Sequence, residues 1–209
     1  MIMQTVRAPV SHPLDISDLR PTQITVGVHE VDAHAARIKK LAKDKDTLAR
    51  KHLIPVVKGP KDRLYVIDHH HLCRALLLVG LDKVLVTVVL NLQRLDKDAF
   101  WFFMDNRGLV HPFDEDGKRR AYSDIPKKIN DLIDDPYRSL AGALRRKGGY
   151  AKDTTPFSEF LWADFLRRHF DRAQIEKNFA ATLEAACQLA KKKDADYLPG
   201  WCGPVEEEA

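Results

Sequence analysis

The stretch YVIDHHHLCRALLLVG, residues 65–80, decides how the first half of the chain is interpreted. It places Asp68 and three consecutive histidines between a short apolar run and a longer one that ends at a glycine. The first run is rich in β-branched residues, as strands are, whereas the second has apolar residues at helical spacing. The pattern predicts a strand, a polar turn and a helix in direct succession.

The polar turn has four possible roles: binding a metal, binding a phosphate, capping the helix, or acid/base chemistry. Consecutive residues point about 100° apart on a helix and to opposite faces on a strand, so three adjacent imidazoles do not converge on one metal ion. We therefore expect no structural zinc. The start of a helix favours an anion through its free N–H groups and dipole, so a phosphate site is the second role. The third is structural, with Asp68 as an ordinary helix N-cap.

The segments around this turn predict an α/β first half. Extended structure is expected at residues 15–27, a helix at 29–44, a pair of strands at 53–59 and 63–68, and a strong strand at 84–90. The two paired strands are separated by Gly-Pro-Lys-Asp, which is a turn signal.

The second half has the pattern of a helical region. Helices are predicted at residues 96–106, 124–135, 136–149, 156–170 and 173–193. Pro126, Pro136 and Pro156 are expected at helix entries. We expect a first domain at residues 1–110 and a helical subdomain at 111–209 that ends in a loose acidic tail.

Composition limits the classes of function. The 209 residues are 44% hydrophobic and 31% charged, which suits a globular protein with a substantial core. The net charge of +4 arises from mixed acids and bases, so we expect at most weak, nonspecific binding to nucleic acid. No signal peptide or membrane-spanning run is seen, and three widely spaced cysteines fit free thiols, so a cytoplasmic location is expected. The oligomeric state stays open.

The segment VIDHHHLCRAL, residues 66–76, resembles the D-G-H-H-R signature of the ParB/sulfiredoxin-like superfamily. That superfamily includes ParB N-terminal domains, sulfiredoxins and ADP-dependent free-serine kinases. The resemblance covers about residues 15–110 and implies an α/β (α+β) fold with a small mixed sheet. Over nearly the full length, segments such as LRPTQITVG, KDTTPFSEFLWADFLRR and YLPGWCG resemble a bacterial ParB-like family that is also labelled a nuclease.

In that superfamily the strand-to-helix turn binds nucleotide phosphates. The resemblance therefore implies that His69, His70 and His71 contact phosphate. His69 stands where the motif has glycine, and Leu72 stands where it has arginine. We expect Arg74, in the next turn of the helix, to substitute for the missing arginine.

Two further segments carry site residues by the same resemblance. GVHEV, residues 27–31, resembles the segment that supplies the catalytic glutamate of the serine kinases, which makes Glu30 the expected base. Stabilisation of a helix start is the alternative role of Glu30. AFWFF, residues 99–103, resembles their aromatic substrate wall, so Trp101 is expected in the substrate pocket, with core packing as the alternative. Asp68 would orient substrate or Mg²⁺.

These expectations lead to one preferred function and two alternatives. The preferred function is a phosphotransferase that uses ADP or ATP with Mg²⁺ and acts on a small hydroxylated substrate. One alternative is a ParB-like DNA-associated protein or metal-dependent nuclease. The other is a ligand-binding protein that has kept the fold and catalyses nothing. The sequence does not identify the nucleotide or the substrate.

Overall fold

The chain is described by a computed structural model over residues 8–9, 13–41 and 53–204. It forms two compact units. The first contains the residues up to Val26 together with Val31–Ile133, and the second contains Gly27–Glu30 and the residues from Asp134 onward. The proposed domain division at residue 110 stays a prediction. The predicted acidic tail falls largely on residues 205–209, which lie outside the described residues.

The first unit is built on a mixed sheet with the strand order β1-β7-β5-β6-β3, and β2 also pairs with β7. The β3–β6 and β5–β7 pairs are parallel, and the β1–β7, β2–β7 and β5–β6 pairs are antiparallel. The predicted α+β fold with a small mixed sheet is therefore confirmed. The strands are β1 (Ala8–Pro9), β2 (Leu14–Asp15), β3 (Leu19–Arg20), β5 (Leu53–Lys58), β6 (Leu64–Val66) and β7 (Lys83–Asn91).

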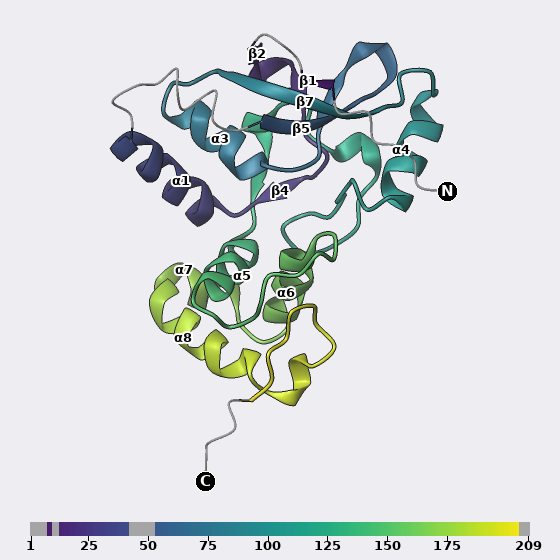
Figure 1. The fold of residues 1–209 in the computed structure, drawn as a ribbon. Helices are drawn as coiled ribbons and strands as arrows, with labels where there is room; N and C mark the ends of the chain where they lie inside the picture. The colour runs from purple at the N-terminus through teal and green to yellow at the C-terminus, as the bar shows by residue number, and fades with distance from the viewer. Residues whose placement is uncertain (1–7, 10–12, 42–52, 205–209) are drawn as a thin grey trace. The chain divides into compact units, whose positions relative to one another are not determined.

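Helices cover both faces of this sheet. Val56 and Val66 belong to a core cluster with α1 (Val28–Leu41) and α3 (His70–Leu78), which lie side by side in Figure 1. The neighbouring residues Val57 and Tyr65 belong to a second cluster with α4 (Lys97–Asn106). Because successive strand residues point to opposite faces, one short hairpin supplies both cores.

The second unit is helical and is organised around α5 (Pro136–Arg146). This helix packs against α6 (Ser158–Arg167), α7 (Arg172–Lys177) and α8 (Phe179–Ala190) (Figure 1). Its N-cap is Asp135, whose Oδ1 accepts the Tyr137 N–H at 2.9 Å, and Pro136 follows at the first helical position. The helix entry predicted at Pro136 is confirmed.

Most predicted elements are present. The predicted helices that became α1, α3, α4, α5 and α6 are confirmed, as are the β5–β6 hairpin and strand β7. Gly80 closes α3 with a φ of 75°, and the Leu81 N–H donates to the Leu76 carbonyl at 2.9 Å. This is the left-handed glycine exit that the sequence indicated.

The helix predicted at residues 124–135 was wrong, and so was a helix entry at Pro126. After η3 (Tyr122–Asp124), that segment forms the 3₁₀ turn η4 (Ile129–Asp131) and the short strand β8 (Ile133–Asp134). The Ile133 N–H donates to the Ile24 carbonyl at 3.0 Å, so its backbone is used in pairing. Aspartates at the end of such a helix would also face the negative pole of its dipole.

The single helix predicted at residues 173–193 was also wrong, because the chain breaks at Asn178 into α7 and α8. Asn178 has φ −152° and ψ 79°, and its Oδ1 accepts the Ala181 N–H at 3.1 Å. Asparagine is a good N-cap, so it ends one helix and starts the next while the apolar pattern continues. The shorter elements are β4 (Thr25–Val26), η1 (Ile16–Asp18), η2 (Pro60–Asp62), η3 (Tyr122–Asp124) and η5 (Lys193–Ala195).

Candidate functional site

The polar turn between β6 and α3, residues 68–71, is called the histidine turn. His69 has φ 68° and ψ 24°, a left-handed conformation that is unfavourable for a residue with a Cβ atom. Asp68 Oδ1 accepts the N–H of His69 at 2.6 Å. The N-cap of α3 is His69, so the alternative role of Asp68 as an ordinary N-cap is wrong. The left-handed backbone puts one extra residue between the strand-end carboxylate and the helix.

This geometry leaves the start of α3 suited to an anion. His69 makes no side-chain capping hydrogen bond, and the first turn of α3 contains no acidic residue. The N–H groups of a first helical turn lack intrahelical acceptors, and the helix dipole adds partial positive charge there. Asp68 is exposed beside this turn, with a side-chain exposure of 72%.

His70 is buried, with 3% of its surface exposed, and its Nε2 accepts the backbone N–H of Thr22 at 3.1 Å. The Thr22 hydroxyl donates to the Val66 carbonyl at 2.7 Å. Burial lowers the pKa of His70 to about 3, so the ring is neutral near pH 7. His70 thus joins the turn to the segment after β3, and its contact with phosphate stays a prediction.

The other predicted phosphate ligands lie around the same helix start. His69 is exposed, and its Nδ1 lies 3.9 Å from Asp68 Oδ1. His71 is half-buried on the first turn. Arg74 lies on the second turn, where its Nη1 donates to the Leu132 carbonyl. The structure therefore brings Asp68 and the three histidines together, whereas one nitrogen of Arg74 is already used in packing the first unit.

Trp101 lies on α4 in an aromatic cluster of the first unit. It is 6% exposed, stacks on Tyr122 with ring centroids 5.6 Å apart, and meets Tyr65 edge-on at 5.4 Å. The Tyr122 hydroxyl donates to Asp105 Oδ2 at 2.5 Å, and the Arg119 guanidinium also contacts that oxygen. These contacts show core packing for Trp101, and its role as a substrate wall stays a prediction.

Glu30 belongs to the second unit, in the first turn of α1. It is 9% exposed, its Oε2 accepts Arg138 Nη1 at 2.9 Å, and its Oε1 lies 3.4 Å from Arg146 Nη1. Just before it, the N–H of Val28 donates to Asp134 Oδ1 at 2.8 Å, and that of His29 donates to Ser139 Oγ at 3.2 Å. The predicted base is therefore a buried carboxylate that is paired with two arginines.

Gly142 completes this arrangement. A Cβ atom on Gly142 would lie 2.8 Å from Glu30 Oε2, 3.1 Å from Arg138 Nη1 and 3.4 Å from Arg146 Nη1. Three charged groups thus converge over the one residue of α5 that has no side chain. We call Glu30, Arg138, Gly142 and Arg146 together the arginine cradle.

The arginines of the cradle were missed in the sequence, as was Thr22. Arg138 and Arg146 are eight residues apart, so they share a helix face, and a glycine lies midway between them. That spacing was a signal in the sequence. Thr22 acts partly through its backbone N–H, for which no side-chain pattern exists.

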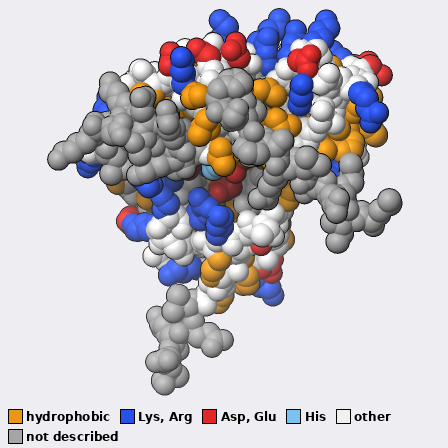
Figure 2. Space-filling model, turned by 45° about the horizontal axis from the view of Figure 1, so that its top comes forward, with side chains coloured by type: hydrophobic (Ala, Val, Ile, Leu, Met, Phe, Trp, Pro, Cys, Tyr) orange, Lys and Arg blue, Asp and Glu red, His pale blue; other side chains and the backbone are white. Residues whose placement is uncertain are grey.

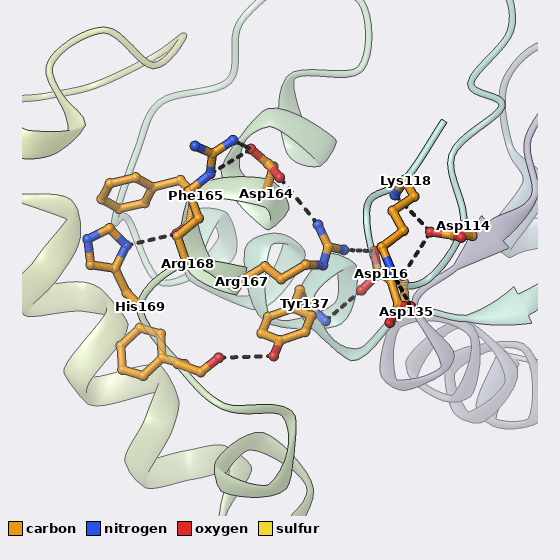
Figure 3. A network of polar contacts seen from close by, with 11 residues as sticks. Asp114, Asp116, Lys118, Asp135, Tyr137, Asp164, Phe165, Arg167, Arg168 and His169 are labelled. Atoms are coloured by element: carbon orange, nitrogen blue, oxygen red, sulfur yellow. Dashed lines mark hydrogen bonds and ion pairs between the residues drawn. The ribbon is translucent and has the colours of Figure 1, made fainter. Parts of the chain in front are cut away.

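Figure 3 includes a second polar network of the second unit, formed by Asp135, Tyr137, Asp164 and Arg167. Asp135, 1% exposed, accepts a hydrogen bond from Arg167 Nη2 at 2.8 Å, and Arg167 also pairs with Asp164 at 3.7 Å. Burial raises the pKa of the Asp135 carboxyl, and the Arg167 charge opposes that rise. The Arg167 guanidinium also lies 4.9 Å from the centre of the Tyr137 ring. The network joins the start of α5 to the end of α6.

Charges on the surface are mixed. Figure 2 shows Asp and Glu side chains among the Lys and Arg side chains along the upper edge of the face it draws. Within the described ranges, no three His, Cys, Asp or Glu side chains are grouped so as to hold a metal ion. None of the helices in the part of the chain that the structure covers is long and apolar enough to cross a bilayer.

Comparisons with known proteins agree with this architecture. A family model described as "Putative ParB-like nuclease" matches residues 12–168. The crystal structure of protein Atu1540 from Agrobacterium tumefaciens is similar to the chain, with a TM-score of 0.88 and 50% sequence identity. The match covers 95% of this chain and 100% of that protein. No curated protein matches the chain.

Proposed function

We propose, because the chain belongs to the ParB-like family, that it binds nucleotide phosphate at the histidine turn and transfers a phosphoryl group to a small hydroxylated acceptor. The observation that carries the proposal is the start of α3, where a left-handed His69 makes no side-chain cap and no acidic residue occupies the first turn. Such a terminus favours a phosphate group through its N–H groups and its dipole. The similarity to free-serine kinases is part of this proposal.

Each residue of the histidine turn has a proposed role in holding phosphate or Mg²⁺. The α3 N–H groups, with His69 and His71 beside them, would hold phosphate oxygens, and His70 would keep the turn in place through Thr22. ADP or ATP would bind with Mg²⁺. Asp68 fits such an ion, since Mg²⁺ commonly takes one or two carboxylates together with substrate phosphates, and this side chain is exposed. The ion would neutralise phosphate charge during transfer.

Glu30 is the proposed base, and it would accept the proton of the acceptor hydroxyl. The test is phosphate transfer from ADP or ATP with Mg²⁺ to serine, other hydroxy amino acids and sugars. Mass spectrometry would detect the phosphorylated products. Glu30→Gln keeps the side-chain size and removes the base, so turnover should fall by about 10²- to 10⁴-fold. An unchanged rate would contradict the assignment of Glu30. If no acceptor reacts, a ligand-binding protein without catalysis becomes the better account.

A ParB-like DNA-associated protein or metal-dependent nuclease is the second candidate, and the description of the matching family favours it. Residues 147–157 separate α5 from α6, which is longer than the turn of a helix-turn-helix. We therefore expect only salt-sensitive, nonspecific binding to DNA. Sequence-selective binding that survives physiological salt would move this candidate to first place.

A further inference from the structure

The arginine cradle of the second unit has the composition of an oxyanion site. Arg138 and Arg146 carry two positive charges, and Glu30 supplies one negative charge between them. Arg145, on the same helix, pairs with Glu159 at 3.2 Å and so adds no net charge. The cradle thus keeps one positive charge in excess.

The two guanidinium groups hold Glu30 unequally. Arg138 Nη1 lies 2.9 Å from Glu30 and its side chain is 9% exposed, whereas Arg146 Nη1 lies 3.4 Å away on a side chain that is 48% exposed. The Arg146 pair is therefore the longer and more accessible one. An incoming anion would replace the carboxylate on Arg146 first.

Arg138 offers a further donor. Its Nε is buried and makes no hydrogen bond within the described part of the chain. The guanidinium lies 5.2 Å from the centre of the Phe160 ring, within the range of a cation–π contact. A buried N–H without an acceptor is unfavourable, and a planar guanidinium matches the oxygens of phosphate well. Gly142 leaves the space in which the charged groups meet.

We propose that the arginine cradle is a second anion site, which binds a phosphate monoester group in exchange for the Glu30 carboxylate on Arg146. Glu30 is then an internal competitor that occupies the site when no ligand is bound. Binding at the cradle does not depend on the function proposed for the histidine turn. One consequence does rest on that function, because the exchange would free one Glu30 oxygen to accept a proton.

The test is protection of Arg146 from phenylglyoxal, a reagent that modifies arginine, with the modified peptides quantified by mass spectrometry. In the unmodified protein, inorganic phosphate should protect Arg146 and leave Arg168, whose side chain is 70% exposed, at its original rate. Equal loss of reactivity at both arginines, or none, would overturn the proposal. Parallel arms with phosphoserine and ADP would distinguish a phosphorylated small molecule from a nucleotide as the source of the phosphate.

Variants of the cradle sharpen the result. Glu30→Gln removes the internal competitor, so half-protection of Arg146 should need at least about tenfold less phosphate. Glu30→Gln combined with Arg138→Gln removes one charge of each sign and should abolish protection. An unchanged phosphate requirement in a folded Glu30→Gln protein would contradict the proposal. If Glu30→Gln does not fold, the unmodified protein alone decides the outcome.

The two activities can fail separately. Loss of phosphate transfer with intact protection of Arg146 would count against the proposed function alone. Normal transfer without protection would count against the cradle alone.

Discussion

The histidine turn of the first unit and the arginine cradle of the second unit differ in where their charge lies. At the turn, burial keeps His70 neutral, and the positive potential comes from the backbone at the start of α3. In the cradle, the buried pair of Glu30 and Arg138 is joined by the exposed Arg146, so charged side chains pair directly with one another. The turn can lose one imidazole without creating a buried charge, whereas the cradle cannot lose Arg138 without doing so.

Arg138→Met should therefore have the largest effect on stability. It removes the closer partner of a buried carboxylate, and breaking such a pair costs about 3–5 kcal/mol of unfolding free energy. Denaturant unfolding followed by the signal of the second unit would measure it. The matched control is Glu30→Gln combined with Arg138→Met. It removes both charges, so its unfolding free energy should fall less than that of Arg138→Met alone. A loss below about 1 kcal/mol in the single variant would contradict the buried pair.

His70 makes the stability of the first unit depend on pH. Its pKa falls from 6.5 to about 3 on folding, so the unfolded state binds the proton more tightly. Its contribution to stability is complete above pH 6.5 and is lost as the pH falls from 6.5 through about 3. From pH 7 to pH 5 the loss should be about 2 kcal/mol.

The measurement is the unfolding free energy at both pH values in the unmodified protein and in His70→Asn. The variant lacks the titrating ring and should show a smaller loss across this window. His71→Asn, one residue along, serves as the control and should keep the loss. Equal pH dependence in the His70 variant and the unmodified protein would show that His70 is not buried in its neutral form.

Gly142→Ala should have a smaller effect, confined to the cradle. The added Cβ would lie 2.8 Å from Glu30 Oε2, so the carboxylate must move, and we expect a loss of about 1–2 kcal/mol. The same change in a Glu30→Ala background meets no carboxylate, and only Arg138 Nη1, 3.1 Å from the added Cβ, has to shift. In that background the loss should be smaller, because the higher helix propensity of alanine offsets part of it. Thermal unfolding of the unmodified protein, Gly142→Ala, Glu30→Ala and the double variant would measure these differences in stability.

The smallest change is expected at His69, where a substitution should stabilise the protein. Glycine adopts φ 68° without strain, so His69→Gly should gain about 0.5–1 kcal/mol after its own entropic cost. His71→Gly, inside the first turn of α3, is the matched control and should lose a similar amount. A loss of stability in His69→Gly would contradict a strained left-handed turn.

The sequence predicted those features that depend on local pattern. Alternating and helical apolar spacing located the β5–β6 hairpin, β7 and α3, and Gly80 marked the end of that helix. The sequence-based prediction failed where a polar residue caps a helix while the apolar spacing continues, as Asn178 does between α7 and α8. His69 stands where the motif has glycine, and its φ of 68° is a conformation that glycine adopts without strain.

Contacts between distant segments could not be derived in the same way. Glu30 was singled out by resemblance, but its partners lie more than a hundred residues away on α5, and ion pairing over that separation leaves no local periodicity. The expected contact of His70 with phosphate stays a prediction, and the fold adds that its Nε2 accepts a backbone N–H from Thr22. Patterns identified these residue types, and only the fold supplies their partners.

The central claim is that the start of α3 binds phosphate, and nucleotide binding tests it most directly. Thermal unfolding would be followed with ADP or ATP and Mg²⁺, in the unmodified protein and in Arg146→Gln, which weakens the cradle and keeps the histidine turn. We predict that nucleotide raises the melting temperature in both, because ligand binding to the folded state stabilises it. In the Arg146→Gln protein, the rise should disappear when His69→Ala and His71→Ala are added. No rise with either nucleotide in the unmodified protein, or an undiminished rise when the two histidine changes are added to Arg146→Gln, would contradict the account.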